Sequence, residues 1–442
     1  MADYKTNCPH TSDHKPKCVC RHVFAGLSEQ YYRFFNGQSH EYDLVCNQCK
    51  KYLDRIRINM KKVCHTCFEK IESDGEFVKF LGAPEITKNS GKLCFEHLRT
   101  PGPIIAGRSI RAIQPIVGVG GSKWVMVDST SAVSILDLEN FTLVTVTFLD
   151  LEKVNLNGKI GIKVSADGHY AAVVSRVNRI DGERDSNKGV VLDLHSGLET
   201  MVLDRGDYYT ELSEFSIAFY DYNDKVYLVH ATDWNRLDVS DPATGELVTE
   251  RSFKQRPKEA WRFKYKAGSE FYGNLIVSPS NKRIADFGWC WGPYGALSSW
   301  SLSEWLEKNV WEADNGPSKF DMNSYQYYWD GAVCWINDNT ICAWGIGDDD
   351  ESLIAGAMIF DARNGKQLSW FPGPGPSLFT YDQYLFTTEL EGNSTSVWDV
   401  ESGKRLHQEA DFTPNCYHHG SQQFLTALED GSFIISYLSS PD

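Results

Sequence analysis

The sequence predicts a mainly β fold built from a repeated four-stranded unit, preceded by a small cysteine-rich module. Short alternating runs rich in Val, Ile, Tyr and Trp meet at turn residues along most of the 442-residue chain. The turns recur every 52 residues or so, about the length of two hairpins and their connections. Eight of the twelve cysteines, by contrast, lie within the first 94 residues.

Hairpins of two types alternate in the repeated region. The first type recurs seven times, at residues 116–127, 162–174, 217–230, 275–287, 333–344, 378–388 and 424–438. The second type follows it, as in "GVVLDLHSGLETMVL" and "SVWDVESGKRLHQE". Two hairpins make four strands, and a small four-stranded sheet must pack against neighbours around an axis to bury both of its faces. We therefore expect a β-propeller over residues 108–442, with seven blades and six as the alternative.

Closure of the ring needs one more strand than the second hairpin type supplies. The second type occurs six times, and the chain ends four residues after the seventh copy of the first. An uncovered strand edge would weaken the circle. We expect "RSIRAIQPI" (108–116) to pair with the last unit, and "PGPIIAG" (101–107) to be a linker.

The repeats resemble those of the WD-repeat and related β-propeller proteins. Trp398 and Asp399 form the Trp-Asp dipeptide itself, and degenerate copies occur at Leu136-Asp137, Leu192-Asp193, Leu237-Asp238 and Phe360-Asp361. Residues 230–251 also look like bacterial propeller proteins of unassigned function. The resemblance covers about residues 108 to 442. It implies the propeller architecture and no particular activity.

A zinc site is predicted in the cysteine-rich module, residues 1–100. Cys46, Cys49, Cys64 and Cys67 form two C-x-x-C pairs with fourteen residues between them. Each pair lets two thiolates reach one ion from a tight turn, and two pairs complete the tetrahedron that Zn²⁺ accepts from sulfur. A redox pair or chance spacing is the alternative.

A second zinc site has several potential ligands. We favour Cys8, Cys18, Cys20 and Cys94, with His97 or His22 as substitutes. The alternative is that Cys94 is a buried core thiol and that the histidines are solvated. Closed sites of four cysteines, or of three cysteines and one histidine, leave no open coordination position, so neither site is expected to be catalytic.

The charge is distributed unevenly along the chain. Residues 1–107 hold 16 Lys and Arg against 12 Asp and Glu, a net +4, and the remainder holds 28 against 47, a net −19. The acidic part argues against nucleic-acid binding through its broad surface. A basic patch in the module permits binding of nucleic acid or of an acidic partner, with a solvated loop as the alternative: Lys50, Lys51, Arg55, Arg57, Lys61 and Lys62.

Aromatic residues are concentrated in one part of the repeated region. Trp289, Trp291, Tyr294, Tyr327 and Trp329 lie on expected loops and are candidates for partner binding, because large semi-rigid side chains bring contact area at low entropic cost. Core packing is the alternative. No nucleophile elbow, phosphate-cradling loop or H-E-x-x-H motif occurs.

These features predict a non-enzymatic scaffold in which the propeller binds a protein partner and carries a structural zinc module. The alternatives are a nucleic-acid-binding adaptor acting through the basic module, or a propeller enzyme with an active site at the channel end. The chain shows neither a secretion leader nor a run of eighteen apolar residues. We therefore expect a cytoplasmic protein that does not enter a membrane.

Overall fold

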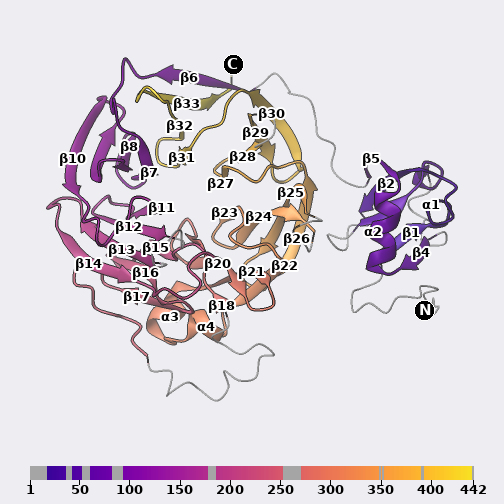
Figure 1. Ribbon diagram of the computed structural model, residues 1–442, viewed down its shortest axis with the longest axis horizontal. Coiled ribbons are helices and arrows are strands. Elements are labelled where there is room, and N and C mark those ends of the chain that lie inside the picture. The colour runs from indigo at the N-terminus through magenta and orange to yellow at the C-terminus, as the bar shows by residue number, and fades with distance from the viewer. Residues whose placement is uncertain are drawn as a thin grey trace. The chain divides into compact units, whose positions relative to one another are not determined.

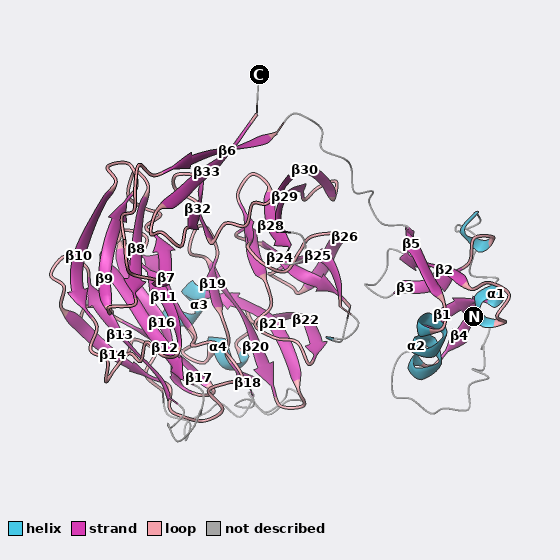
Figure 2. Ribbon diagram, turned by 45° about the horizontal axis from the view of Figure 1, so that its top comes forward, coloured by secondary structure: helices cyan, strands magenta, loops and turns pink. Residues whose placement is uncertain are grey.

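The computed structural model describes residues 17–35, 42–51, 60–81, 93–177, 186–251, 270–347, 350, 353–389 and 393–440. These residues belong to two compact units, one containing the described residues up to 81 and the other beginning at residue 93. Strands dominate both units, and the helices are short (Figure 2). No helix in the described ranges is long and apolar enough to cross a bilayer.

The unit that begins at residue 93 is a seven-bladed β-propeller, so the predicted fold and blade number are confirmed. In its described residues, seven sheets surround a central axis (Figure 1). Blade 1 contains β7 (Ile110–Pro115), β8 (Lys123–Asp128), β9 (Ala132–Asp137) and β10 (Thr142–Phe148). Blade 2 contains β11 (Lys159–Val164), β12 (Tyr170–Val177), β13 (Ser186–Asp193) and β14 (Glu199–Asp204).

Blades 3 and 4 depart from the four-stranded pattern. Blade 3 contains β15 (Ile217–Tyr222), β16 (Lys225–Asp233) and β17 (Arg236–Ser240). Blade 4 contains β18 (Glu270–Phe271), β19 (Leu275–Val277), β20 (Arg283–Cys290), β21 (Tyr294–Ser301) and β22 (Phe320–Gln326). Two helices, α3 (Leu302–Glu307) and α4 (Glu312–Asn315), lie in the connection between β21 and β22.

The last three blades again have four strands each. Blade 5 contains β23 (Val333–Asn337), β24 (Thr340–Ile346), β25 (Ile354–Asp361) and β26 (Lys366–Pro372). Blade 6 contains β27 (Phe379–Tyr381), β28 (Leu385–Glu389), β29 (Ser394–Asp399) and β30 (Lys404–Ala410). Blade 7 contains β31 (Cys416–His418), β32 (Gln423–Ala427), β33 (Phe433–Ser439) and β6 (Cys94–Arg99).

The ring is closed by β6, which pairs antiparallel with β33 from Cys94 opposite Ser439 to Arg99 opposite Ile434. The expectation that residues 108–116 close the ring is wrong, because β7 in that stretch is the innermost strand of blade 1. The predicted seventh copy of the first hairpin type is also displaced by one strand. Residues 424–438 form the second and third strands of blade 7, since β31 precedes them. The C-terminal segment therefore supplies the first three strands of blade 7, and β6 supplies the outermost one.

The division between the two units lies earlier than the predicted boundary at residue 100. Cys94–Arg99 belong to the propeller sheet. The predicted linker, residues 101–107, folds onto blade 7, where the amides of Ile104 and Ile105 donate to the carbonyl oxygen of Gly431 at 2.9 and 3.2 Å. Ile105 is buried. Because these residues are hydrogen-bonded and partly buried, they are part of the propeller.

Packing between blades explains the hydrophobic pattern of the repeats. The second strand of a blade is covered on both faces, so β12 is apolar over most of its length, whereas β10 at an outer edge is largely exposed. Trp398 of the Trp-Asp dipeptide is fully buried, and its indole N–H donates to Thr387 Oγ1 at 2.9 Å. Asp399 accepts a hydrogen bond from the amide of Glu401 and holds the turn that follows.

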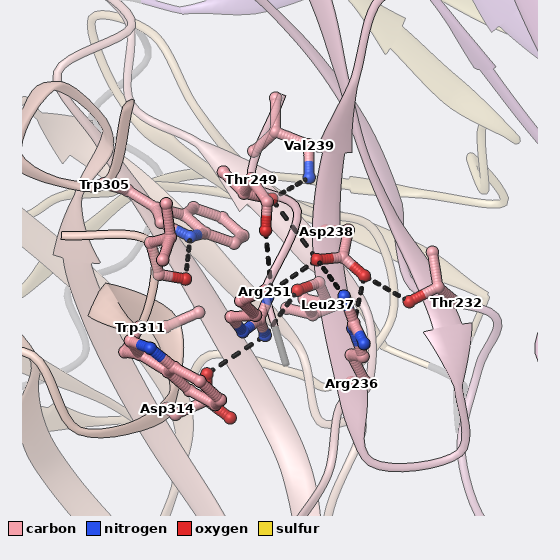
Figure 3. A network of polar contacts seen from close by, with 12 residues as sticks. Thr232, Arg236, Leu237, Asp238, Val239, Thr249, Arg251, Trp305, Trp311 and Asp314 are labelled. Atoms are coloured by element: carbon pink, nitrogen blue, oxygen red, sulfur yellow. Dashed lines mark hydrogen bonds and ion pairs between the residues drawn. The ribbon is translucent and has the colours of Figure 1, made fainter. Parts of the chain in front are cut away.

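A buried ionic network joins blade 3 to α4 (Figure 3). The guanidinium of Arg251 pairs with Asp238 of β17 and with Asp314 of α4, the latter at 3.0 Å. Arg236 also pairs with Asp238, at 2.6 Å. Arg251, Asp238 and Asp314 are each at most 3% exposed in their side chains. The network therefore links two blades through charges removed from water.

The first unit is a small module with one five-stranded sheet, ordered β4-β1-β3-β2-β5. Its elements are β1 (Lys17–Cys20), α1 (Arg21–Phe24), β2 (Gln30–Phe35), β3 (Tyr42–Val45), β4 (Met60–Val63), α2 (His65–Ser73) and β5 (Glu76–Leu81). Phe68 of α2 and Leu44 of β3 contribute to its small apolar core. So few buried side chains provide limited stability by themselves.

Candidate functional site: a cysteine–histidine cluster and an aromatic face

Four potential metal ligands meet in the module: Cys20, His22, Cys46 and Cys49. Cys20 ends β1, His22 lies in α1, and the two other cysteines follow β3 in a tight turn. The ligand atoms all lie within 4.8 Å of one another. His22 Nδ1 is 3.3 Å from Cys49 Sγ and 3.5 Å from Cys46 Sγ. A tetrahedral zinc site with ordinary bond lengths has nitrogen–sulfur edges of about 3.6 Å, so the donor set fits such an ion.

Without a cation, burial and close proximity disfavour the ionisation of the thiols in this cluster. Burial, together with the neighbouring Cys20 and Cys46 sulfurs, raises the pKa of the Cys49 thiol to about 12. Burial also raises the pKa of Cys20. A bound divalent cation supplies the positive charge that allows such thiols to ionise and coordinate. The cluster can therefore hold a metal ion, with three sulfurs and one nitrogen as its donors.

The structure groups the predicted ligands differently from either predicted set. Cys46 and Cys49 lie with Cys20 and His22, whereas Val63, which precedes Cys64, pairs with Lys17 at the other end of β1. The two ends of this strand are about 10 Å apart, so the two C-x-x-C pairs lie at separate places. The amide of Cys67 donates to Cys64 Sγ at 3.4 Å.

The other described ligands predicted for the second site lie on two different strands. Cys18 lies on β1 opposite Lys62, and Cys8 is outside the described residues. Cys94 and His97 lie on β6 in the propeller, where they are 3.1 Å from Ser439 Oγ and 2.7 Å from Ser436 Oγ. His22, named from the sequence as a substitute ligand of the second site, lies with Cys20, Cys46 and Cys49 instead.

The basic patch is partly engaged within the module. Lys50 Nζ lies 4.4 Å from the centre of the Tyr32 ring and donates to its hydroxyl at 2.9 Å, and Lys61 lies 5.0 Å from the Phe24 ring. Lys51 and Lys62 are exposed. Arg55 and Arg57 are outside the described residues.

Strand order assigns the propeller loops to two opposite faces. In each blade, the turn between the second and third strands lies on the same face as the connection to the next blade. We call this the connection face. The turns between the first and second strands and between the third and fourth strands lie on the opposite face, here the hairpin face.

An aromatic cluster lies on the connection face, over blades 2 to 4. Its rings form a chain in which Tyr208 is 5.1 Å from Trp234, Trp234 is 4.7 Å from Phe271, and Phe271 is 4.6 Å from Trp289. Trp289 is in turn 4.7 Å from Trp291, which is 5.4 Å from Tyr209. We call Tyr208, Tyr209, Trp234, Phe271, Trp289 and Trp291 the aromatic cluster.

The aromatic cluster has a buried base and an exposed top. Phe271 and Trp289 are buried, whereas Tyr208, Tyr209 and Trp291 are 44%, 41% and 45% exposed. Side chains packed on a rigid base lose little conformational entropy when a partner covers them. The arrangement can therefore present apolar contact area in a fixed geometry.

The predicted partner-binding residues differ in their exposure and contacts in the structure. Trp291 is exposed in the cluster, whereas Trp289 supports it from below. Tyr294 and Tyr327 are exposed, and the Trp329 indole N–H donates to the carbonyl oxygen of Leu212. The sequence reasoning missed Tyr208, Tyr209, Trp234 and Phe271, because they are isolated from the tryptophan-rich segment along the chain. The adjacent tyrosines of "RGDYYTE" were the available signal.

Asp330 holds the loops beneath the connection face. Its carboxylate accepts hydrogen bonds from the amide of Glu214 at 2.9 Å and from the amide of Asn274 at 3.0 Å, so it joins three loops. Burial raises the pKa of Asp330 to about 6. The positions of these loops thus depend on one buried acid.

Acidic side chains surround the aromatic cluster. Asp207 and Glu211 flank the two tyrosines, and Asp233 precedes Trp234, with all three exposed. The described cations of the same loops are engaged elsewhere. Arg205 is 1% exposed and donates to Ser213 Oγ at 3.0 Å, and Arg236 pairs with Asp238. The exposed charge around the described cluster is therefore negative.

Comparisons with known proteins find similar solved structures but no family. No protein-family model matches the chain, and no curated protein is significantly similar to it. The WD40 repeats of RRP9 match with a TM-score of 0.48 and 12% identity, over 81% of this chain and 99% of that one. The Cps50 (Swd1) β-propeller domain of Myceliophteria thermophila matches with a TM-score of 0.46 and 11% identity, over 78% and 100%.

BamB from Moraxella catarrhalis gives a TM-score of 0.45 and 12% identity, over 77% of this chain and 98% of that one. The strand pairing of the chain itself defines the class of fold: a β-propeller with seven blades in the described residues.

Proposed function

We propose that this protein is a non-enzymatic interaction scaffold that binds a protein partner through the aromatic cluster. The observation that carries the proposal is the set of three half-exposed aromatic side chains, Tyr208, Tyr209 and Trp291, stacked on a buried base. Large aromatic side chains that are pre-ordered in this way dominate the energy of many protein interfaces. A gathered group of them on one face is also unusual for a surface that only meets water.

The surrounding charge favours a basic partner. Asp207, Glu211 and Asp233 would attract a cationic segment and speed its association. Arginine suits such a surface especially well, because its guanidinium can stack on an aromatic ring while it pairs with a carboxylate. We therefore favour a partner segment that contains arginine and an apolar anchor residue.

The cysteine-rich module is proposed to be a structural zinc domain. Three sulfurs and a nitrogen in a buried cluster fit Zn²⁺, and no position of a four-ligand site remains open for a substrate. Thiols arranged for a metal also suit a reducing compartment such as the cytoplasm. The nucleic-acid alternative has less support, because Lys50 and Lys61 already interact with aromatic rings of the module.

The test compares proteins captured by the full-length chain and by two variants. Tyr209→Ala/Trp291→Ala removes two exposed rings from the aromatic cluster. Val144→Ala/Phe148→Ala removes two apolar side chains that are even more exposed, from β10 at the outer edge of blade 1. Quantitative mass spectrometry of captured proteins should reveal a partner whose recovery falls at least tenfold with the first variant and is unchanged with the second. Equal recovery with both variants would contradict the proposal.

A further inference from the structure

Two histidines and one aspartate meet on the hairpin face of blade 2. His169 lies in the turn between β11 and β12, Asp193 is the last residue of β13, and His195 lies in the turn between β13 and β14. One ligand atom from each lies within 4.8 Å of those from the other two. These residues belong to neither of the sites described above, since the aromatic cluster lies on the opposite face of the propeller.

We infer that His169, Asp193 and His195 form a binding site for a divalent transition-metal ion. His169 Nε2 is 3.3 Å from Asp193 Oδ2, and the two imidazole rings are 4.6 Å apart between centres. Metal–nitrogen and metal–oxygen bonds of ordinary length give a tetrahedral edge of about 3.3 Å, so the first pair is already spaced for a shared ion. The ligand atom of the exposed His195 lies within 4.8 Å of both of these atoms.

Backbone hydrogen bonds fix the carboxylate in the required orientation. Asp193 Oδ1 accepts from the amides of His195 at 2.8 Å and Ser196 at 3.0 Å. Asp193 Oδ2 is thereby directed toward His169. The ring of His169 stacks on Tyr170 at 4.3 Å, which limits its rotation.

Blade 5 contains the same turn without the imidazoles. In blade 5, Asp361 accepts from the amide of Arg363 at 2.9 Å, and the amide of Ala362 donates to the carbonyl oxygen of Asn339. In blade 2, the amide of Leu194 donates in the same way to the carbonyl oxygen of His169. Asn339 and Arg363 therefore correspond to His169 and His195. The turn forms with either pair, so its geometry does not require histidine.

Blade 1 supports the same conclusion. Its turn aspartate, Asp137, accepts from the amide of Glu139 at 3.0 Å, and the amide of Leu138 donates to the carbonyl oxygen of Ser122. Ser122 and Glu139 thus occupy the two positions that hold histidines in blade 2. Among these three turns, blade 2 alone combines two imidazoles with the carboxylate.

The donor atoms indicate the class of ion. Two imidazoles and one carboxylate suit Ni²⁺, Cu²⁺ or Zn²⁺ better than Mg²⁺ or Ca²⁺, which prefer oxygen ligands. Three protein ligands leave coordination positions open to water or to an exogenous group. The site differs in this respect from the cysteine–histidine cluster, whose four ligands fill the coordination sphere.

The test measures Ni²⁺ binding to the untagged full-length protein by calorimetry, after one equivalent of zinc has been added for the cysteine–histidine cluster and loosely bound zinc has been removed. We expect one further Ni²⁺ per chain. His169→Asn/His195→Arg installs the blade 5 residues in the same turn and should weaken this binding at least a hundredfold without loss of folding. His419→Ala, which removes an exposed histidine elsewhere on the propeller, should leave the binding unchanged.

A gain-of-function variant provides a second readout. Asn339→His/Arg363→His places the two imidazoles beside Asp361 and should add a second nickel site. Unchanged nickel affinity in His169→Asn/His195→Arg would overturn the inference, as would the absence of any further nickel site in the wild-type protein. A crystal soaked in Ni²⁺ should show an anomalous peak between His169 and Asp193, and a peak confined to other residues would also overturn it.

Discussion

The module and the propeller hold their folds together by different means. The propeller buries continuous layers of apolar side chains between blades, such as the cluster around Val125, Val173 and Val190. The module buries few large apolar residues, and several positions in its interior are cysteines, among them Cys20, Cys46 and Cys49. A unit with little apolar surface to bury needs another source of free energy, and coordination of a metal is one.

The two candidate metal sites also differ in what holds their ligands in place. The ligands of the module come from separate elements, and its cysteines are buried, so its ion would tie the fold together. The cluster of His169, Asp193 and His195 sits on two turns whose backbone is already fixed by hydrogen bonds, and it is partly exposed. The two clusters share only histidine as a ligand type, and we expect an ion in the first to support the fold and an ion in the second to be accessible and dispensable for folding.

Removal of zinc should have the largest effect and should act on the module alone. Structural zinc contributes on the order of 10 kcal/mol or more in small domains, which exceeds the stability expected of this core. After treatment with a strong chelator, amides of β1 and β3 should exchange with deuterium at nearly the unfolded rate, and those of β12 should not change. Hydrogen-exchange mass spectrometry measures both in one sample.

Three serine variants refine this prediction. Cys49→Ser should reproduce the effect of the chelator, and Cys94→Ser on β6 should not. Cys64→Ser tests whether Cys64 shares an ion with Cys46 and Cys49, as the sequence predicts. Protection of the module in Cys49→Ser equal to that of the wild type would show that the metal does not hold the module together.

The propeller could be predicted because its signal is repeated. Seven copies of a hairpin pattern average out errors in any one of them, and the apolar strands and turn aspartates such as Asp399 are local features. The closing strand was not predictable from the same signal. β6 is short, and four of its six residues are exposed, so "CFEHLR" carries little hydrophobic pattern. Its role depends on a partner more than 330 residues away along the chain.

The sites were less predictable than the fold. The sequence identifies cysteines as ligands, but their grouping depends on which ends of strands meet, and the register of β1 with β4 separates Cys64 from Cys46. The aromatic cluster combines loops of three blades, so Tyr209 and Trp291 are 82 positions apart in the sequence. A single sequence holds no signal for that proximity.

Loss of one buried charge should have the next largest effect, and it should act on the propeller. Arg251→Leu leaves Asp238 and Asp314 buried without their shared partner. Breaking such a network costs about 3 to 5 kcal/mol. Denaturant unfolding, followed by a probe in the propeller, measures the change.

Arg363→Leu is the matched control, because Arg363 pairs with Asp361 in the same way but its side chain is 60% exposed. It should change the stability little, since water screens exposed pairs. Equal destabilisation by the two variants would show that burial does not decide the contribution of these charges. The stability of the propeller would then not depend on the burial of the Arg251 network.

Acid should produce the smallest of the three effects, again in the propeller. Burial lowers the pKa of His230 to about 4, and its Nε2 is 2.8 Å from Ser240 Oγ. The unfolded chain binds a proton below about pH 6.5, whereas the folded chain does so only near pH 4. The contribution of His230 is therefore complete above pH 6.5 and is lost as the pH falls. At pH 5 the loss should be about 2 kcal/mol.

His230→Gln keeps a hydrogen-bonding side chain in β16 but cannot titrate. The stability of this variant should fall less between pH 7 and pH 5 than that of the wild type, by about 2 kcal/mol, whatever its stability at pH 7. The midpoint of denaturant unfolding at the two pH values measures the difference, with the module saturated with zinc in both proteins. An identical pH dependence in the two proteins would mean that His230 is not the group through which acid weakens the propeller. The acid sensitivity would then have to come from the metal ligands of the module or from other buried groups.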